Sequence, residues 1–383
     1  MSKATSGGDL VSVLTKEKKI RIVPDTSLDS LIAASILLKT LREHNKSPRV
    51  SLDPKLLLDD RDEPSILLNL PPVSGSRQVS LVFTGESSIT GIIASLLDDL
   101  FVIEWWDKVL AIIAGLYRNL YVFREGKFKG VEDRILRELI SSKKLVEVPS
   151  MLRAWGVDRL GLARSLKRTL IPFMPGLTGN IEPIKEITQR IFKRNPEELR
   201  VLDASNEKEM ILLLEFLREL ARVLNVNVGE LSNKLLGDFI VSSEVFEGLK
   251  LQLSEAMGAL LVFNSLEKRN PLYVIGVSVD SSLIPSMLTV YEEHIEEASS
   301  LLGITIPKWL ADRSEYIDVE EFFERPGIVA DILGNLNALP QGRPVLILHE
   351  GVKVTELREL LRIGVKPEDA YARCDEVQLC VVK

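Results

Sequence analysis

The sequence contains very little of the residue types on which many functional sites depend. It has only three histidines, His44, His294 and His349, and only two cysteines, Cys374 and Cys380, in 383 residues. Two cysteines near one end of a chain do not make a disulfide framework, so we do not expect a disulfide-rich secreted fold. The scarcity of histidine also limits the imidazole ligands that a catalytic metal centre could use.

Long apolar runs are missing as well. No stretch of about eighteen apolar residues is free of charges, which argues against a membrane-spanning helix. The first residues, MSKATSGGD, lack the apolar centre of a signal peptide. With 45% apolar and 27% charged residues, the composition is typical of a globular protein, and the length predicts two domains. We therefore predict a cytoplasmic protein that does not bind a membrane.

The chain also has no excess of positive charge, since its net charge is −7 at pH 7. Affinity for nucleic acid comes largely from Lys and Arg side chains that neutralise phosphates. The total charge therefore argues against strong autonomous DNA binding, although it is compatible with a local basic groove. An acidic surface that keeps the protein soluble is the simpler explanation of the total.

The most informative stretch is residues 21–40, RIVPDTSLDSLIAASILLKT. A short β-branched strand runs into the turn Pro24-Asp25-Thr26-Ser27 and then into an apolar helix. Ser27 or Thr26 can cap this helix, because a side-chain oxygen there accepts hydrogen bonds from the free N–H groups of the first turn. Open α/β sheets place their ligands at such strand ends, where free N–H groups and the helix dipole meet.

This stretch resembles the first motif of the DHH phosphoesterase superfamily, the fold of RecJ-type single-strand nucleases. In that family a strand is followed by His-x-Asp-x-Asp-Gly and by a helix that contains Ser-Ala-Ala-Ile-Leu. The helical part is kept here in residues 29–37, DSLIAASIL. The catalytic part is changed, because the family's His falls on Asp25 and its first Asp on Ser27. Only the second Asp is kept, as Asp29.

The later metal-binding motifs of the family are also altered in this sequence. The predicted strand SILLNL ends at Asn69, where the family has Asp, and the next predicted strand is followed by Thr84, Gly85 and Glu86 instead of Asp-His-His. Arg118 lies near the position of a further metal-binding Asp, and a cation there would repel a divalent metal. The resemblance therefore implies a vestigial site.

Chemistry leads to the same expectation. Two-metal phosphodiester cleavage needs several carboxylates and imidazoles around two ions that lie about 3.5 to 4 Å apart. Near the expected site the acidic groups are Asp25, Asp29 and Glu86, and no histidine lies at a strand end in the N-terminal half. We therefore expect no metal and no cofactor. The alternative role of Asp25 and Asp29 is structural, as turn and helix-start residues.

The order of the predicted elements gives an α/β fold with an N-terminal doubly wound, mostly parallel sheet. We predict a DHH-like domain at 1–200 with a helical insertion, a helical connector at 201–240 and a smaller α/β domain at 241–383. Residues 131–195 are predicted to be helical. The stretch 272–279, LYVIGVSV, is predicted to be a strand.

The last sixty residues resemble the DHHA1 domain, the nucleic-acid-binding domain that accompanies DHH modules. That domain has a Ser-x-Arg strand and a glycine-rich loop that approaches phosphate. Here Ile347 and His349 occupy the Ser and Arg positions, and Gly364 is the glycine that remains in the loop. Lys366 and His349 are the candidates left for a phosphate contact, so this element is altered too.

One segment is locally basic and carries Trp155 beside its cations. A basic helix with an aromatic side chain can follow a single strand while stacking a base, although a solvated helix face is the commoner explanation. The candidate DNA-binding residues in this segment are Arg153, Arg159, Arg164, Lys167 and Arg168.

Loss of the catalytic groups in a retained architecture resembles the inactive branch of the RecJ-like family, the archaeal counterparts of the eukaryotic cell-division-cycle forty-five protein. The resemblance implies a non-catalytic, nucleoid-associated subunit of the replicative helicase assembly, which binds the GINS complex and the MCM ring and has at most weak contact with single-stranded DNA. Two alternatives stay open: a RecJ-like single-strand exonuclease with an altered metal site, and a single-strand-binding module without helicase partners.

Overall fold

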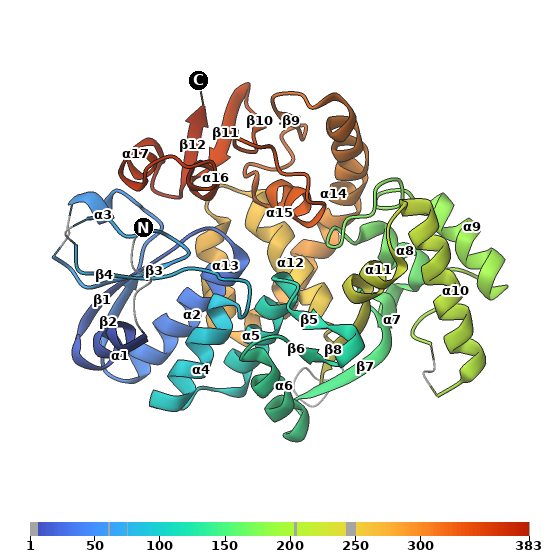
Figure 1. Cartoon of the computed structure of the whole chain (residues 1–383), viewed down its shortest axis with the longest axis horizontal. Coiled ribbons are helices and arrows are strands. Elements are labelled where there is room, and N and C mark those ends of the chain that lie inside the picture. The colour runs from blue at the N-terminus through green and yellow to red at the C-terminus, as the bar shows by residue number, and fades with distance from the viewer. Residues whose placement is uncertain (1–6, 60–61, 75, 203–204, 243–249, 383) are drawn as a thin grey trace.

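A parallel sheet with helices on both sides organises the N-terminal part of the chain (Figure 1). The computed structural model describes residues 7–59, 62–74, 76–202, 205–242 and 250–382. The strand order is β2-β1-β3-β4, and all neighbours are parallel. This order is that of a doubly wound sheet, as predicted. The strands are β1 (Lys19–Pro24), β2 (Ser47–Val50), β3 (Ser65–Leu68) and β4 (Gln78–Leu81).

Helix α2 (Leu28–Glu43) is the central element of this part of the chain. Pro24 ends the preceding strand, and α2 then packs against α4, α5 and α13, so most of its residues are buried. Small side chains such as Ala33, Ala34 and Ser35 let these neighbours approach closely. The other helices of this part are α1 (Gly7–Lys16), α3 (Leu56–Asp59), α4 (Ile89–Phe101) and α5 (Trp105–Tyr117).

The middle of the chain differs from the prediction in one respect, because residues 131–195 are not helical throughout. Leu145–Leu152 form strand β7, which pairs antiparallel with β8 (Leu236–Val241) far along the chain. The hairpin β5 (Tyr121–Val122) and β6 (Lys127–Phe128), with the short turn η1 (Phe123–Glu125), precedes this region. The helices are α6 (Glu132–Ser141), α7 (Val157–Leu160), α8 (Leu162–Arg168), α9 (Ile181–Phe192), α10 (Glu207–Leu224) and α11 (Val228–Leu235).

The C-terminal part combines helices with a four-stranded mixed sheet, in the order β12-β11-β10-β9. Residues 272–279, which we predicted to be a strand, belong to helix α13 (Asn270–Val279), with Pro271 in its first turn. The strands are β9 (Ile317–Asp318), β10 (Ile347–His349), β11 (Val352–Glu356) and β12 (Leu379–Val382). The helices are α12 (Leu253–Leu266), η2 (Ser281–Leu283), α14 (Ile284–Asp312), α15 (Gly327–Asn335), α16 (Leu357–Arg362) and α17 (Pro367–Arg373).

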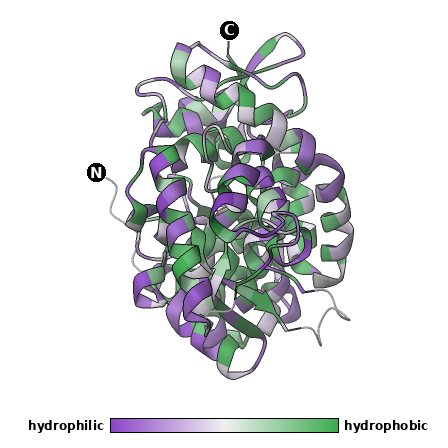
Figure 2. Cartoon of the chain, turned by 90° about the vertical axis from the view of Figure 1, so that its right-hand side faces the viewer, coloured by the Kyte–Doolittle hydropathy of each residue, from purple (hydrophilic) through white to green (hydrophobic). Residues whose placement is uncertain are grey.

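Three apolar clusters hold these parts together. The largest joins the N-terminal sheet and its helices to α12, α14 and α15, the second lies among α8 to α11, and the third packs α16 and α17 against β1 and β3. Figure 2 shows the side of α9 and α10, whose helices carry both hydrophobic and hydrophilic residues, as helices with one face on a core do. The domain boundaries at 200 and 240 stay a prediction. Among the described residues, no helix is both long and apolar enough to cross a membrane.

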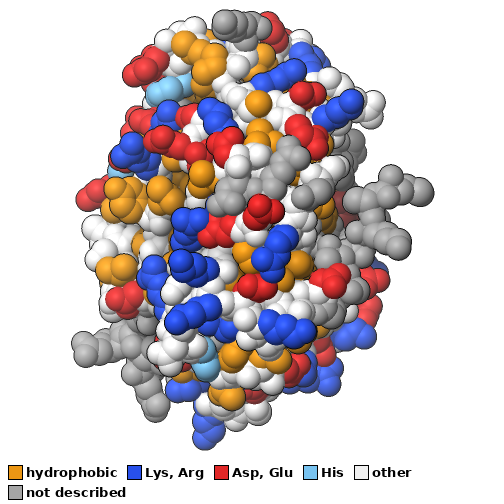
Figure 3. All heavy atoms as spheres, turned by 90° about the vertical axis from the view of Figure 1, so that its left-hand side faces the viewer, with side chains coloured by type: hydrophobic (Ala, Val, Ile, Leu, Met, Phe, Trp, Pro, Cys, Tyr) orange, Lys and Arg blue, Asp and Glu red, His pale blue; other side chains and the backbone are white. Residues whose placement is uncertain are grey.

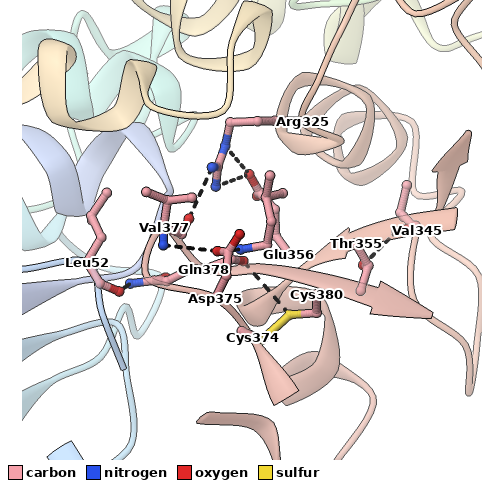
Figure 4. The surroundings of a disulfide bond; sticks show 11 residues. Leu52, Arg325, Val345, Thr355, Glu356, Cys374, Asp375, Val377, Gln378 and Cys380 are labelled. Atoms are coloured by element: carbon pink, nitrogen blue, oxygen red, sulfur yellow. Dashed lines mark hydrogen bonds and ion pairs between the residues drawn. A yellow bond between two sulfur atoms is a disulfide. The ribbon is translucent and has the colours of Figure 1, made fainter. Parts of the chain in front are cut away.

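The two cysteines form a disulfide that closes the turn between α17 and β12 (Figure 4). This turn reaches back to the N-terminal sheet, because the side-chain amide of Gln378 donates to the carbonyl oxygens of Pro24, at 2.7 Å, and Leu52, at 3.0 Å. A single bridge is not a disulfide framework, but the sequence did not lead us to expect it. It closes a short loop near the C-terminal end whose Gln378 contacts the N-terminal sheet.

The packing of α12 gives a direct test of the fold. A methyl group at Gly258 would lie 2.5 Å from the ring of Trp155, which is fully buried, whereas a methyl group at Gly276 in α13 would meet no atom within 4 Å. We expect Gly258→Ala to lower the free energy of unfolding by about 1 to 3 kcal/mol, because the indole cannot move aside. Gly276→Ala should raise it by up to about 1 kcal/mol through helix propensity. Urea unfolding of both variants measures the difference, and equal effects would contradict this packing.

Candidate functional site

A cleft of about 390 Å³ lies at the carboxyl ends of the parallel strands. Four of the residues expected at the vestigial site line it, namely Asp25, Ser27, Asn69 and Arg118. The opposite wall comes from α15 and α16 of the C-terminal part, which contribute Asp331 and Arg358 among others. The position follows the general rule for open α/β sheets, in which ligands bind beyond the carboxyl ends of the strands.

Asp29, the carboxylate kept from the family motif, is fully buried and completely engaged. Its carboxylate accepts hydrogen bonds from the backbone N–H groups of Ile89, at 3.1 Å, and Thr90, at 2.8 Å, so it caps the start of α4. The Arg118 Nε donates to the same carboxylate at 2.8 Å. Asp29 therefore has a structural role, but its hydrogen bonds cap α4 and not its own helix α2, and it pairs with Arg118.

Arg118 is held in place by more than this ion pair. It follows the last residue of α5, and its guanidinium lies over the ring of Phe83, 4.4 Å from the centroid. Burial opposes the charge of Arg118, but the Asp29 carboxylate outweighs burial and holds the pKa of Arg118 above its ordinary value. The guanidinium is thus a permanent cation beside the acid that a divalent metal would need.

Asp25, at the position of the family's histidine, also has hydrogen-bond partners for both of its carboxylate oxygens. One of its oxygens accepts from the backbone N–H and the hydroxyl of Ser27, and the other accepts from the side-chain amide of Asn69 at 2.6 Å. Ser27 occupies the N-cap position of α2, but its hydroxyl bonds to Asp25 instead of capping the helix. Asp25 thus acts as the turn residue that the alternative interpretation described.

The residues present do not fit the two metal ions of a DHH nuclease. Asp29 is paired with Arg118, and Asp25 is surrounded by the hydroxyl of Ser27 and the amide of Asn69. In the part of the chain that the structure describes, no group of three His, Cys, Asp or Glu residues is arranged to hold a metal ion. No hydrolytic step through a metal can therefore be derived from this arrangement.

The remaining members of the expected vestigial set lie elsewhere. Thr84, Gly85 and Glu86 are exposed in the loop after β4 and are not among the residues that line the cleft. The buried acid of this region is instead Glu132 at the start of α6, whose carboxylate accepts from the backbone N–H of Ser88 at 2.7 Å. Burial raises the pKa of Glu132. No motif in the sequence marks Glu132, because the resemblance points only to Glu86 in the loop after β4.

The wall formed by α15 and α16 was not foreseen at all. The Tyr117 hydroxyl donates to Asp331 at 3.0 Å, and the Arg358 guanidinium bonds to Asp331 and to Glu356, each at 2.8 Å. Burial opposes the ionisation of Glu356, but Arg358 and Arg325 on either side outweigh it and hold the pKa of Glu356 below its ordinary value. This buried network joins the two walls of the cleft. No sequence motif marks it, because its members are brought together only by the tertiary fold.

The candidate DNA-binding segment is largely neutralised inside the fold. Arg153 and Arg168 are buried, and Trp155, the aromatic expected to stack a base, is fully buried as well. Arg168 makes two hydrogen bonds to the carboxylate of Glu292 on α14, at 2.8 and 2.9 Å. Arg153 and Arg168 therefore do not belong to the solvated basic helix face that was expected.

The other cations of this segment, which are exposed or half-buried, are paired with α14 or its neighbour α12. Arg164 and Lys167 both bond to Glu296, at 2.8 and 2.7 Å, and Arg159 bonds to Glu255 at 2.6 Å. The ion pairs supply a structural reason for these cations, since they fasten α7 to α12 and α8 to α14. A DNA-binding role for the segment stays a prediction.

The two C-terminal candidates do not reach the cleft. His349 lines a separate hollow beside Cys374, and Lys366 is exposed just before α17. Their predicted contact with phosphate stays untested by this geometry. The structure thus brings together the strand-end residues of the vestigial set and keeps the basic candidates apart from them.

The Asp29–Arg118 pair gives a prediction about stability. Arg118→Met would leave a fully buried carboxylate without its cation, which costs about 3 to 5 kcal/mol of the free energy of unfolding. The double variant Asp29→Asn/Arg118→Met should lose less, because no buried charge remains. Arg137→Met is the matched control, since its pair with Asp133 lies at the surface and is worth about 1 kcal/mol at most. Denaturant unfolding measures all three, and a loss no larger than the control's would refute the buried pair.

Comparison with known proteins identifies the fold. Neither a protein-family model nor a curated protein sequence matches the chain. The crystal structure of CDC45 from Entamoeba histolytica matches 91% of this chain and 85% of its own, with 9% sequence identity and a TM-score of 0.56. The structure of RecJ with Mn²⁺ from Thermus thermophilus matches 91% of this chain and 46% of its own, with 10% identity and a TM-score of 0.39. The chain therefore has the fold of CDC45, which confirms the predicted fold class and, at the level of the fold, the predicted resemblance.

Proposed function

We propose that this chain is a non-catalytic, RecJ-like subunit of a replicative helicase assembly, in which it binds the GINS complex and the MCM ring as a scaffold. The observation that carries the proposal is the Asp29–Arg118 pair, because it puts a fixed guanidinium where a nuclease of this fold needs a metal. The likeness of the fold to CDC45 supports the same role. Function still has to be argued from the site, because one fold can serve several functions.

The way in which the two halves are joined also supports a scaffold. The Asn264 amide donates to the carbonyl oxygen of Thr26 at 3.0 Å, and the Tyr117 hydroxyl donates to Asp331 across the cleft. Buried polar contacts of this kind fix one relative position of the elements that they join. A protein that must present a constant surface to several partners benefits from such rigidity.

The surface charge fits a role in which single-stranded DNA is at most a secondary ligand. The net charge is −7, and the cations of the predicted DNA-binding segment are paired with acids of α12 and α14. In this role the main contacts are with proteins, and any guidance of a DNA strand is weak.

Copurification tests the proposal directly. The tagged chain, mixed with GINS and MCM of the same organism at low salt, should elute with both in size-exclusion chromatography. Asp29→Asn/Arg118→Met is a useful companion, because it removes the ion pair, changes the accessible surface only inside the cleft and should keep both partners. Elution of the folded wild-type chain alone, with neither partner, would contradict the scaffold role.

A nuclease assay tests the rival enzyme role. The purified chain is incubated with a labelled single strand and Mn²⁺. We expect the wild type and Asp29→Ala to show the same background cleavage, because Asp29 is already bonded to Arg118 and to the start of α4. The Asp29→Ala variant separates activity of this chain from that of a contaminating nuclease. Metal-dependent cleavage by the wild type that disappears in this variant would favour a RecJ-like exonuclease with an altered metal site.

A further inference from the structure

A cluster of cations lies at the amino ends of β1 and β2, on a chain that is acidic overall. Residues 16–19 and 42–49 contain six Lys or Arg residues and two glutamates. Figure 3 views the side of the molecule that carries α1, β1 and β2, and it shows Lys and Arg side chains gathered over the middle and lower part of this face. We call this the strand-start patch; its cations are Lys16, Lys18, Lys19, Arg42, Lys46 and Arg49.

The fold builds the patch from two segments that hydrogen bonds tie together. The Lys46 ammonium donates to the carbonyl oxygens of Thr15, at 3.0 Å, and Glu17, at 2.8 Å. The backbone N–H of Ser47 donates to the carbonyl oxygen of Lys18 at 2.8 Å. The turn after α1 and the turn after α2 are therefore fixed side by side, and the other cations are carried on this frame.

Four cations of the patch differ from Lys46 in that their side chains form no hydrogen bond within the described residues. Lys16, Lys18, Lys19 and Arg42 are exposed, and among the described residues no ion pair involves any of them. Arg49, in contrast, is paired with Glu63. Lys16 and Arg42 lie in the last turns of α1 and α2, where a cation stabilises the helix dipole. That explanation does not extend to Lys18 and Lys19, which lie beyond the helix and at the start of β1.

The chemistry of the patch favours a phosphate backbone over a protein surface. The patch consists of six Lys and Arg side chains, and the two acidic residues in the same two segments are Glu17 and Glu43, so the charge of the segments is positive. Protein interfaces usually have an apolar core, whereas nucleic-acid interfaces are polar and strongly positive. Positive charge collected on one face of an acidic protein is the arrangement that phosphates recognise.

We propose that the strand-start patch binds the phosphate backbone of nucleic acid without regard to sequence. The patch lies at the amino end of β1, whereas Asp25 and the cleft follow its carboxyl end, so the two sites are separated by the strand, which spans about 20 Å. The inference therefore concerns a surface other than the vestigial site and the predicted basic segment. It does not depend on the proposed binding of GINS or MCM.

Fluorescence anisotropy of a labelled, mixed-sequence single strand and of the matching duplex tests the proposal with the full chain alone. We expect binding that weakens between about 50 and 200 mM salt. In Lys16→Ala/Lys18→Ala/Lys19→Ala, affinity at low salt should fall at least about tenfold, and the slope of log affinity against log salt should fall by about 2. Lys129→Ala/Lys208→Ala/Lys308→Ala removes three exposed lysines from other elements and should bind like the wild type.

Several results would overturn the proposal. One is absence of salt-dependent binding by the wild type, and another is an equal loss in both triple variants, which would indicate only net charge. Polyglutamate serves as competitor, and displacement of the strand by polyglutamate at an equal concentration of charge would assign the patch to an acidic protein segment instead. Because the assay contains no GINS or MCM, its outcome is distinct from that of the copurification.

Discussion

The ion pair between Asp29 and Arg118 is the constraint on which the site depends. The carboxylate starts α4 through backbone hydrogen bonds and holds the guanidinium that ends α5, so one buried acid sets the position of two helices. A metal ion can exchange with solvent, but a guanidinium is attached to the chain and stays charged throughout the physiological pH range. The ion pair thereby makes this side of the cleft part of the internal structure of the protein.

The network across the cleft extends this constraint to the C-terminal half. Arg358 joins Asp331 to Glu356, and Arg325 approaches Glu356 from the other side. Buried ion pairs add little to net stability, because desolvation offsets most of their attraction, but breaking one partner is costly. Their main effect here is to allow one arrangement of α15 and α16 over the strand ends.

Local patterns predicted the first strand, the helix after it and the polar strand ends, because turn and strand signals act over a few residues. The expected capping bond was wrong for Ser27, whose hydroxyl is used by Asp25. The same signals failed for α13, whose β-branched sequence favours a strand, but whose packing on α2 imposes a helix. They failed for β7, because its partner β8 lies far along the chain. They could not show that Arg168 is buried against Glu292, since burial depends on what covers a residue. Asp25 and Asn69 could be placed at the cleft from the sequence because they follow strand ends, and the opposite wall was missed because it comes from distant helices.

The loop that carries Gln378 has a consequence for how the protein is made. Its amide holds the carbonyl oxygens of Pro24 and Leu52, so the last contact needed at the end of the first strand is supplied by a residue near the other end of the chain. A ribosome releases the amino-terminal sheet long before it has added that residue. During synthesis these two carbonyl oxygens therefore lack the amide of Gln378 until translation has passed position 378, so the carboxyl ends of β1 and β2 are completed last.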